Sequence, residues 1–198
     1  MKSFWDDRYS AAEYVYGEDP NVFFAEQLKK LTPGKIILPC DGEGRNAVYA
    51  ALLGWEVLAF DSSEAGKIKA EKLAQKKNVK IDFIIGDALT INYTQKSVDV
   101  VALIYAHLPA QVRKRLNNAA VSWLKPGGRI ILEAFNPNQI GNLSGGPKEV
   151  SMLLTEQIIK EDFGSLQVKL LQMVETELYE GEFHKGKADV LRFIGQKV

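Results

Sequence analysis

The order of apolar and turn-forming residues constrains the fold of this chain most. Short apolar runs alternate with helical patterns, and residues typical of turns separate them. The apolar runs predict strands over residues 35–39, 55–60, 79–85, 98–105 and 129–135. Two further runs, 166–177 and 188–197, flank a turn-rich stretch and predict a terminal antiparallel hairpin. The intervening patterns predict helices over residues 45–53, 62–77, 109–124 and 155–162.

This order predicts an α/β fold with helices on both faces of a sheet. We expect a Rossmann-like, doubly wound, mostly parallel seven-stranded sheet with an antiparallel C-terminal hairpin strand. Neither a repeat nor a linker divides the 198 residues, so we expect a single domain over residues 1–198. Ligands bind such sheets at the carboxyl ends of the strands.

Composition restricts the function classes. The 25 Lys and Arg balance the 25 Asp and Glu, so the chain lacks the positive field of proteins that bind nucleic acid or anionic membranes. The longest clean apolar run, residues 100–106, is far short of the roughly 20 residues of a membrane span. The charged N-terminus does not resemble a secretion signal. We expect a cytoplasmic protein, monomer or homodimer, with a small-molecule substrate and no nucleic-acid or membrane partner.

The cysteine and histidine content excludes an internal disulfide and gives no sign of a metal site. Cys40 is the single cysteine, so no internal disulfide forms, and no Cys/His cluster predicts a metal site. As a nucleophile Cys40 would need a neighbouring base, which the sequence does not place beside it. The favoured interpretation is that Cys40 is a small residue packed under a ligand.

Polar and glycine residues follow the first three predicted strands. Gly42 and Gly44 after the first strand suit close backbone approach to a ligand, although tight turns give the same pattern. Asp61 after the second strand suits the two hydroxyls of a ribose, or else caps a helix with Ser62. Asp87 after the third suits an adenine amino group, or else forms an Asx turn. Together, in order, they favour an adenosine-containing cofactor.

A set of motifs resembles class I S-adenosylmethionine-dependent methyltransferases. The motifs are Gly42-Glu43-Gly44-Arg45-Asn46-Ala47-Val48, Asp61, Gly86-Asp87-Ala88 and the stretch 124–128, Leu-Lys-Pro-Gly-Gly. Residues 4–9 and 16–21, Gly145-Gly146-Pro147, and Glu180-Gly181 with His184 and Gly186 further resemble the tellurite-resistance and thiopurine-methyltransferase-like branch.

The resemblance implies S-adenosylmethionine as the cofactor. It implies a cofactor site at these positions: Cys40, Asp41, Gly42, Glu43, Gly44, Asn46, Asp61, Ser62, Asp87, Ala88 and Ala106. The chain departs from the family pattern at the end of the first strand, where an acid and a glycine are replaced by Leu38 and Cys40. Asp41 or Glu43 could then serve the cofactor's amino group.

The chain has two histidines. His107 follows the fourth strand, where a substrate would meet the methyl group, and is the candidate catalytic and substrate-binding residue. It could equally be a loop residue that caps the helix after Pro109. For His184 a solvated turn is the safer interpretation, although the family resemblance leaves a substrate-side role open.

The N-terminal region, residues 1–33, is rich in aromatic residues. Phe23, Phe24, Leu28 and Leu31 have helical spacing and are expected to face the core. The preceding residues predict a lid with substrate-binding candidates Trp5, Arg8, Tyr9 and Tyr16, or else an aromatic strap packed on the domain. Arg8 could hold an anion or pair with Asp6 or Asp7. The loop 136–147 is the other candidate wall of the substrate site.

The expected function is methyl transfer from S-adenosylmethionine to a small acceptor, with a sulfur, selenium or tellurium nucleophile as one candidate. One alternative is a non-catalytic regulator that binds S-adenosylmethionine or S-adenosylhomocysteine. A nicotinamide-dependent dehydrogenase is a third possibility, disfavoured because Cys40 and Ala47 stand where a dinucleotide fingerprint has glycine.

Overall fold

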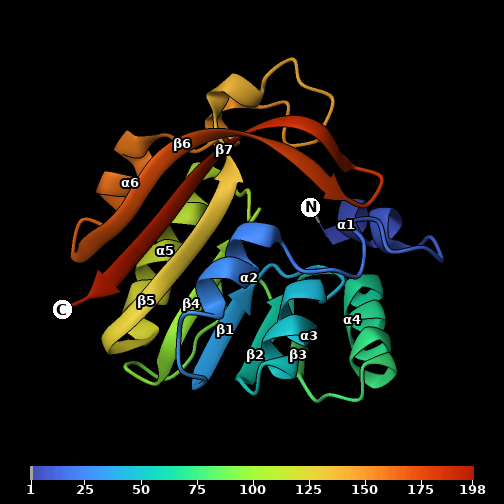
Figure 1. The fold of residues 1–198 in the computed structure, drawn as a ribbon, viewed down its shortest axis with the longest axis horizontal. Coiled ribbons are helices and arrows are strands. Elements are labelled where there is room, and N and C mark those ends of the chain that lie inside the picture. The colour runs from blue at the N-terminus through green and yellow to red at the C-terminus, as the bar shows by residue number, and fades with distance from the viewer. Residues whose placement is uncertain (1) are drawn as a thin grey trace.

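The computed structural model describes residues 2–198 as a seven-stranded sheet flanked by helices on both faces (Figure 1). The strand order is β3-β2-β1-β4-β5-β7-β6, and only β7 runs in the direction opposite to the other six strands. The predicted fold class is therefore confirmed. The strands are β1 Lys35–Pro39, β2 Glu56–Asp61, β3 Asp82–Ile85, β4 Val98–Ile104, β5 Leu124–Phe135, β6 Leu166–Glu180 and β7 His184–Lys197.

Helices cover the two faces of the sheet in two groups. The first group, α2 Val22–Leu28, α3 Arg45–Leu52 and α4 Glu64–Lys76, packs on one face, and Phe24 and Leu28 of α2 are fully buried there. The second group, α5 Ala110–Trp123 and α6 Glu156–Asp162, packs on the other face around Trp123. No helix within residues 2–198 is long and apolar enough to cross a membrane.

Three further short elements lie at one end of the sheet. Helix α1, Lys2–Tyr9, packs against α4, and two 3-10 turns follow β5 at Pro137–Gln139 and Val150–Met152. Figure 1 places α1 beside the turn between β6 and β7, although the two are far apart in the sequence. All these elements lie near the carboxyl ends of the parallel strands.

Several strand boundaries differ from the prediction; the hairpin strands, for example, extend to Glu180 and begin at His184. The third strand starts at Asp82 because the preceding residues close α4 instead: Asn78 has a φ of +54°, and Val79 N–H donates to the Ala74 carbonyl. The fifth strand starts at Leu124 because that residue pairs with Val98 of β4. The helix α1 was not predicted within the aromatic N-terminal region.

Two strands end in the left-handed backbone region without glycine. Cys40 after β1 has a φ of +56°, and Tyr105 after β4 has a φ of +52°. Such conformations are uncommon for non-glycine residues and concentrate at functional sites. The strand order reverses between β1 and β4, so the two turns lie at the switch point of the sheet, where ligands bind.

Candidate active site

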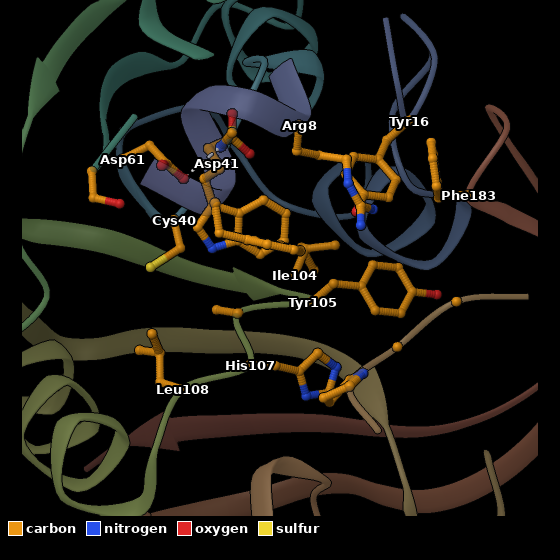
Figure 2. A pocket seen from close by; sticks show the side chains of 18 of the residues that line it. Arg8, Tyr16, Cys40, Asp41, Asp61, Ile104, Tyr105, His107, Leu108 and Phe183 are labelled. Atoms are coloured by element: carbon orange, nitrogen blue, oxygen red, sulfur yellow. Dashed lines mark hydrogen bonds between the residues drawn. The ribbon is translucent and has the colours of Figure 1, made fainter. Parts of the chain in front are cut away.

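A cavity of about 790 Å³ opens at the carboxyl ends of the parallel strands. Its volume is in the range of small-molecule and cofactor sites. Among the predicted site residues only Gly44 does not line it. Figure 2 shows Cys40, Asp41 and Asp61 toward one end and Tyr16 and Phe183 toward the other. We call these ends the cofactor half and the acceptor half.

The glycine loop after β1 is fixed by the carboxylate of Asp61 at the end of β2. Asp61 accepts hydrogen bonds from Gly42 N–H at 3.0 Å and from Ser63 N–H at 2.9 Å. Burial raises the pKa of Asp61, while these backbone bonds oppose the rise. Each carboxylate oxygen has a further acceptor position. The side chain can therefore join the two loops and still accept hydroxyl groups.

Gly42 and Gly44 have different structural roles. A Cβ at Gly42 would lie 2.5 Å from Tyr9 Oη, so this position lets α1 close over the loop. A Cβ at Gly44 would lie 2.4 Å from Ala70 Cβ, so Gly44 lets α3 approach α4. Gly44 thus shapes the loop from behind the cavity wall.

Asp41 places a carboxylate in the cofactor half. It follows Leu38, the position at which the family resemblance leads us to expect an acid, by three residues. Leu38 is buried in the core, whereas Asp41 lines the cavity. Asp41 accepts hydrogen bonds from Asn46 Nδ2 at 3.3 Å and from Ala47 N–H at 3.0 Å. Burial raises the pKa of Asp41 to about 7, partly opposed by these bonds. Burial also raises the pKa of the Cys40 thiol, which disfavours a reactive thiolate.

The remaining cofactor candidates also line the cavity. Asp87 is exposed, and its Oδ1 accepts Leu89 N–H at 2.8 Å in an Asx turn. Its second oxygen is left for a ligand. Ser62, Ala88 and Ala106 line the same cavity. Three carboxylates therefore face the cofactor half, a set that suits a ligand rich in amino and hydroxyl donors.

Glu43 lines the cavity, but its carboxylate is already engaged. Its Oε1 lies 2.7 Å from Lys69 Nζ and accepts Val15 N–H at 3.2 Å, and its Oε2 accepts Tyr16 N–H at 3.3 Å. This differs from the cofactor contact expected for Glu43.

His107 lines the acceptor half with both ring nitrogens engaged by backbone. Its Nδ1 lies 2.9 Å from the Met152 carbonyl, and its Nε2 accepts Phe135 N–H at 3.2 Å. Burial lowers the pKa of His107 to about 4. The neutral ring joins the loop after β4 to the loop after β5, and it does not cap α5. This geometry leaves no nitrogen lone pair for proton abstraction.

His184 is buried at the acceptor half, and not in a solvated turn. Its Nδ1 lies 3.3 Å from Glu180 Oε2, while Nε2 makes no hydrogen bond with any residue in 2–198. Burial lowers the pKa of His184, and that of Glu180 falls to about 2 because His184 and Arg45 bond to it. Glu180 and His184 form the first cross-strand pair of the hairpin, a signal the sequence contained.

Aromatic rings and one arginine complete the acceptor half. The Tyr16 and Tyr105 rings each lie 4.5 Å from the His184 ring. Arg8 lies 4.2 Å from the Phe183 ring, and its Nη1 donates to Tyr16 Oη at 3.4 Å. Within residues 2–198 no carboxylate forms an ion pair with Arg8, so it pairs with neither Asp6 nor Asp7. Trp5 and Tyr9 stack at 5.5 Å in the wall formed by α1.

Buried polar groups support this half from below. Asn21 Nδ2 donates to Glu133 Oε1 at 2.6 Å and to Glu180 Oε1 at 2.9 Å. Arg192 Nε bonds to Glu133 Oε2, and Arg45 pairs with Glu180 at 2.7 Å. Within residues 2–198 no cluster of His, Cys, Asp and Glu could hold a metal ion.

Comparison with known proteins connects this geometry with methyl transfer. Residues 39–128 match the family described as a methyltransferase domain. A search of curated proteins finds no match.

Three solved structures illustrate the similarity of fold. One comes from work on the conversion of a disulfide bond into a thioacetal group during echinomycin biosynthesis (TM-score 0.78, 14% identity, covering 100% of this chain and 91% of that one). The second is TehB from Haemophilus influenzae (TM-score 0.74, 17% identity, 100% and 67%). The third is a SAM-dependent methyltransferase from Methanosarcina mazei (TM-score 0.71, 18% identity, 91% and 99%).

At these identities the structures establish the fold alone. The family match runs from Pro39, the last residue of β1, to Gly128 in β5, and it includes the whole glycine loop and both following acids. The carboxylates of the cofactor half would accept hydrogen bonds from the amino and hydroxyl groups of S-adenosylmethionine. Together the match and the class I fold support S-adenosylmethionine-dependent methyl transfer and identify S-adenosylmethionine as the cofactor.

Proposed function

We propose that the protein transfers the methyl group of S-adenosylmethionine to a small acceptor. The observation that carries the proposal is a single cavity that joins three carboxylates at strand ends to a pocket of aromatic rings with Arg8 and His184. When bound, the cofactor supplies an electrophilic methyl group on a positively charged sulfur. Asp61 would hold the ribose hydroxyls, Asp41 the amino group and Asp87 the adenine.

The acceptor half would position the nucleophile and exclude water. In-line transfer depends mainly on holding the nucleophile, the methyl carbon and the sulfur in line. The rings of Tyr16 and Tyr105 would enclose the methyl group, and aromatic faces suit the positive sulfonium. Residues 4–16 of the predicted N-terminal lid and the loop 136–147 would form the walls.

The proposed acceptor chemistry rests on two polar groups of the acceptor half, Arg8 and His184. Arg8 has no carboxylate partner among the described residues 2–198, and it would bind an anionic group of the acceptor. His184 Nε2, with Nδ1 oriented by Glu180, would accept a proton from a protic acceptor. His107 would only hold the two loops.

A sulfur, selenium or tellurium nucleophile is the acceptor class we favour. Such soft nucleophiles attack a sulfonium methyl group readily and are anionic in thiolate or oxyanion form. The branch resemblance and the sulfur chemistry of the structurally similar protein from echinomycin biosynthesis support this choice.

The test is a turnover assay that follows S-adenosylhomocysteine. Thiols, selenite and tellurite form one acceptor panel, and a phenol, an amine and a carboxylic acid form the other. Production of S-adenosylhomocysteine with the first panel alone is expected. Turnover of the second panel alone would disprove the soft-nucleophile class, and binding without any turnover would favour the regulator.

A further inference from the structure

Two charged side chains of the glycine loop bind the backbone of the N-terminal segment, chiefly at Tyr16. Glu43 accepts the Tyr16 N–H at 3.3 Å, and Arg45 Nη1 donates to the Tyr16 carbonyl at 3.1 Å. Both backbone polar groups of Tyr16 are therefore bound by side chains from Gly42-Glu43-Gly44-Arg45. The neighbouring Val15 N–H also donates to Glu43, at 3.2 Å.

Each of these charges has a buried counter-charge. Lys69 Nζ lies 2.7 Å from Glu43 and donates to the Glu13 carbonyl at 2.7 Å, while Arg45 pairs with Glu180 at 2.7 Å. The side chains of Glu43 and Lys69 are only 3% and 10% exposed. Buried, fully bonded ion pairs leave their members little freedom to move. We call the bonds from Glu43, Arg45 and Lys69 to residues 13–16 the clamp, and we expect it to be stiff.

The clamped residue is a wall of the acceptor half. The Tyr16 ring lies 4.5 Å from the His184 ring and 6.4 Å from the Tyr9 ring. Its hydroxyl receives the hydrogen bond from Arg8 at 3.4 Å. The backbone of Gly42, next to Glu43, faces the cofactor half of the same cavity. The loop therefore touches one ligand site and holds a wall of the other.

We propose that Glu43, together with Arg45, is a positioning residue that couples the cofactor loop to the acceptor wall. A ligand against the loop backbone restrains Glu43, and Glu43 restrains the Val15 and Tyr16 amides. Coupling of this kind is reciprocal, so an ordered segment also favours the bound cofactor. The proposal rests on the proposed function for the position of the cofactor, and it gives Glu43 a role other than cofactor contact.

Hydrogen exchange of the amides in residues 13–17 measures the clamp directly. S-adenosylhomocysteine is the probe, with binding followed by calorimetry. In the unaltered protein the probe is expected to slow exchange of Val15 and Tyr16 at least tenfold. In Glu43→Gln, exchange without probe should rise at least tenfold and the protection by probe should disappear. The affinity for the probe should fall by about tenfold, because reciprocal coupling changes both equilibria by the same factor.

Two further variants keep the result interpretable. Glu56→Gln removes an ion-paired carboxylate that is 67% exposed and far from the cavity, and it should leave exchange at residues 13–17 unchanged. The double variant Glu43→Gln, Lys69→Gln removes both charges of the buried pair. It replaces the single variant if the uncompensated Lys69 prevents folding, and the same loss of protection is expected.

Unchanged exchange at Val15 and Tyr16 in these variants would overturn the proposal. So would a loss of probe affinity in Glu43→Gln as large as in Asp61→Ala, because Glu43 would then be a cofactor ligand. If the unaltered protein does not bind the probe, the proposed function fails. The comparison of exchange without probe still decides whether the clamp exists.

Discussion

The cofactor half and the acceptor half are built in different ways. The cofactor half uses residues that directly follow β1, β2 and β3, within positions 40–89. The acceptor half gathers residues from α1, the segment before α2, the turn after β4 and the β6–β7 hairpin. One half is a set of local turns, and the other is a meeting of remote segments. We therefore expect them to respond differently to substitution.

Removal of Asp61 should produce the largest effect and stay within the cofactor half. Asp61→Ala deletes the acceptor for Gly42 N–H and for a ribose hydroxyl pair. Two hydrogen bonds to a charged group at about 2 kcal/mol each correspond to about 1,000-fold weaker cofactor binding. Calorimetry with S-adenosylmethionine measures it. Asp82→Ala, at an exposed strand start, is the control, and an unchanged affinity in Asp61→Ala would remove the ribose assignment.

His107 should make the acceptor half sensitive to acid. Its pKa is about 4 in the folded protein against 6.5 ordinarily, so the unfolded chain binds the proton first. The free energy of unfolding should therefore fall as pH falls from 6.5 to 4, by up to about 3 kcal/mol from this group.

The variant His107→Gln isolates that contribution. Asp41 acts in the opposite direction, because its raised pKa of about 7 adds stability as pH falls from 7 toward 3.8. The comparison is thus the difference between the two proteins in urea unfolding at pH 6.5 and pH 4. The variant should lose less stability than the unaltered protein over this range. Parallel curves would show that His107 is not held neutral.

Asn21 tests whether the acceptor half depends on its buried network. Asn21→Ala removes the donor shared by Glu133 and Glu180 and should lower the free energy of unfolding by about 2 kcal/mol. Urea denaturation measures it. The same change at the exposed Asn138 should have almost no effect. Equal stability of both variants would mean that the two carboxylates find other donors.

Arg8 should have the smallest effect, confined to the acceptor. Arg8→Gln should leave cofactor affinity unchanged and raise the KM of an anionic acceptor about tenfold, equivalent to about 1.4 kcal/mol. Steady-state kinetics with thiol or selenite measures it, with Arg115→Gln on the exposed face of α5 as the control. If Arg8→Gln also lowered the affinity for the cofactor, Arg8 would contribute to both halves of the cavity and not to the acceptor half alone.

The accuracy of sequence-based prediction follows the same division. Strand ends and glycine turns depend on neighbours in sequence, so the positions of Asp41, Asp61 and Asp87 in one cavity were predictable. Whether each contacts the cofactor stays a prediction. The roles of histidine depended on distant partners: His107 bonds to Met152, 45 positions away, and His184 is enclosed by Tyr16 and Tyr105. The position of Arg8 likewise depends on its contact with the Phe183 ring, which is remote in the sequence.

Local patterns in the amino-acid sequence were enough to predict the alternation of strands and helices, the terminal hairpin and the acids at strand ends. Apolar periodicity and turn residues act over a few positions, and parallel strands bring their carboxyl ends to one edge. Which polar groups are left open to a ligand depends instead on how distant segments pack together. Glu43 and His107 have their polar atoms taken by backbone from other segments, whereas His184 keeps one nitrogen open and Arg8 has no carboxylate partner within residues 2–198. Hydrogen-bond capacity is finite, and its assignment is fixed by packing between segments far apart in the chain.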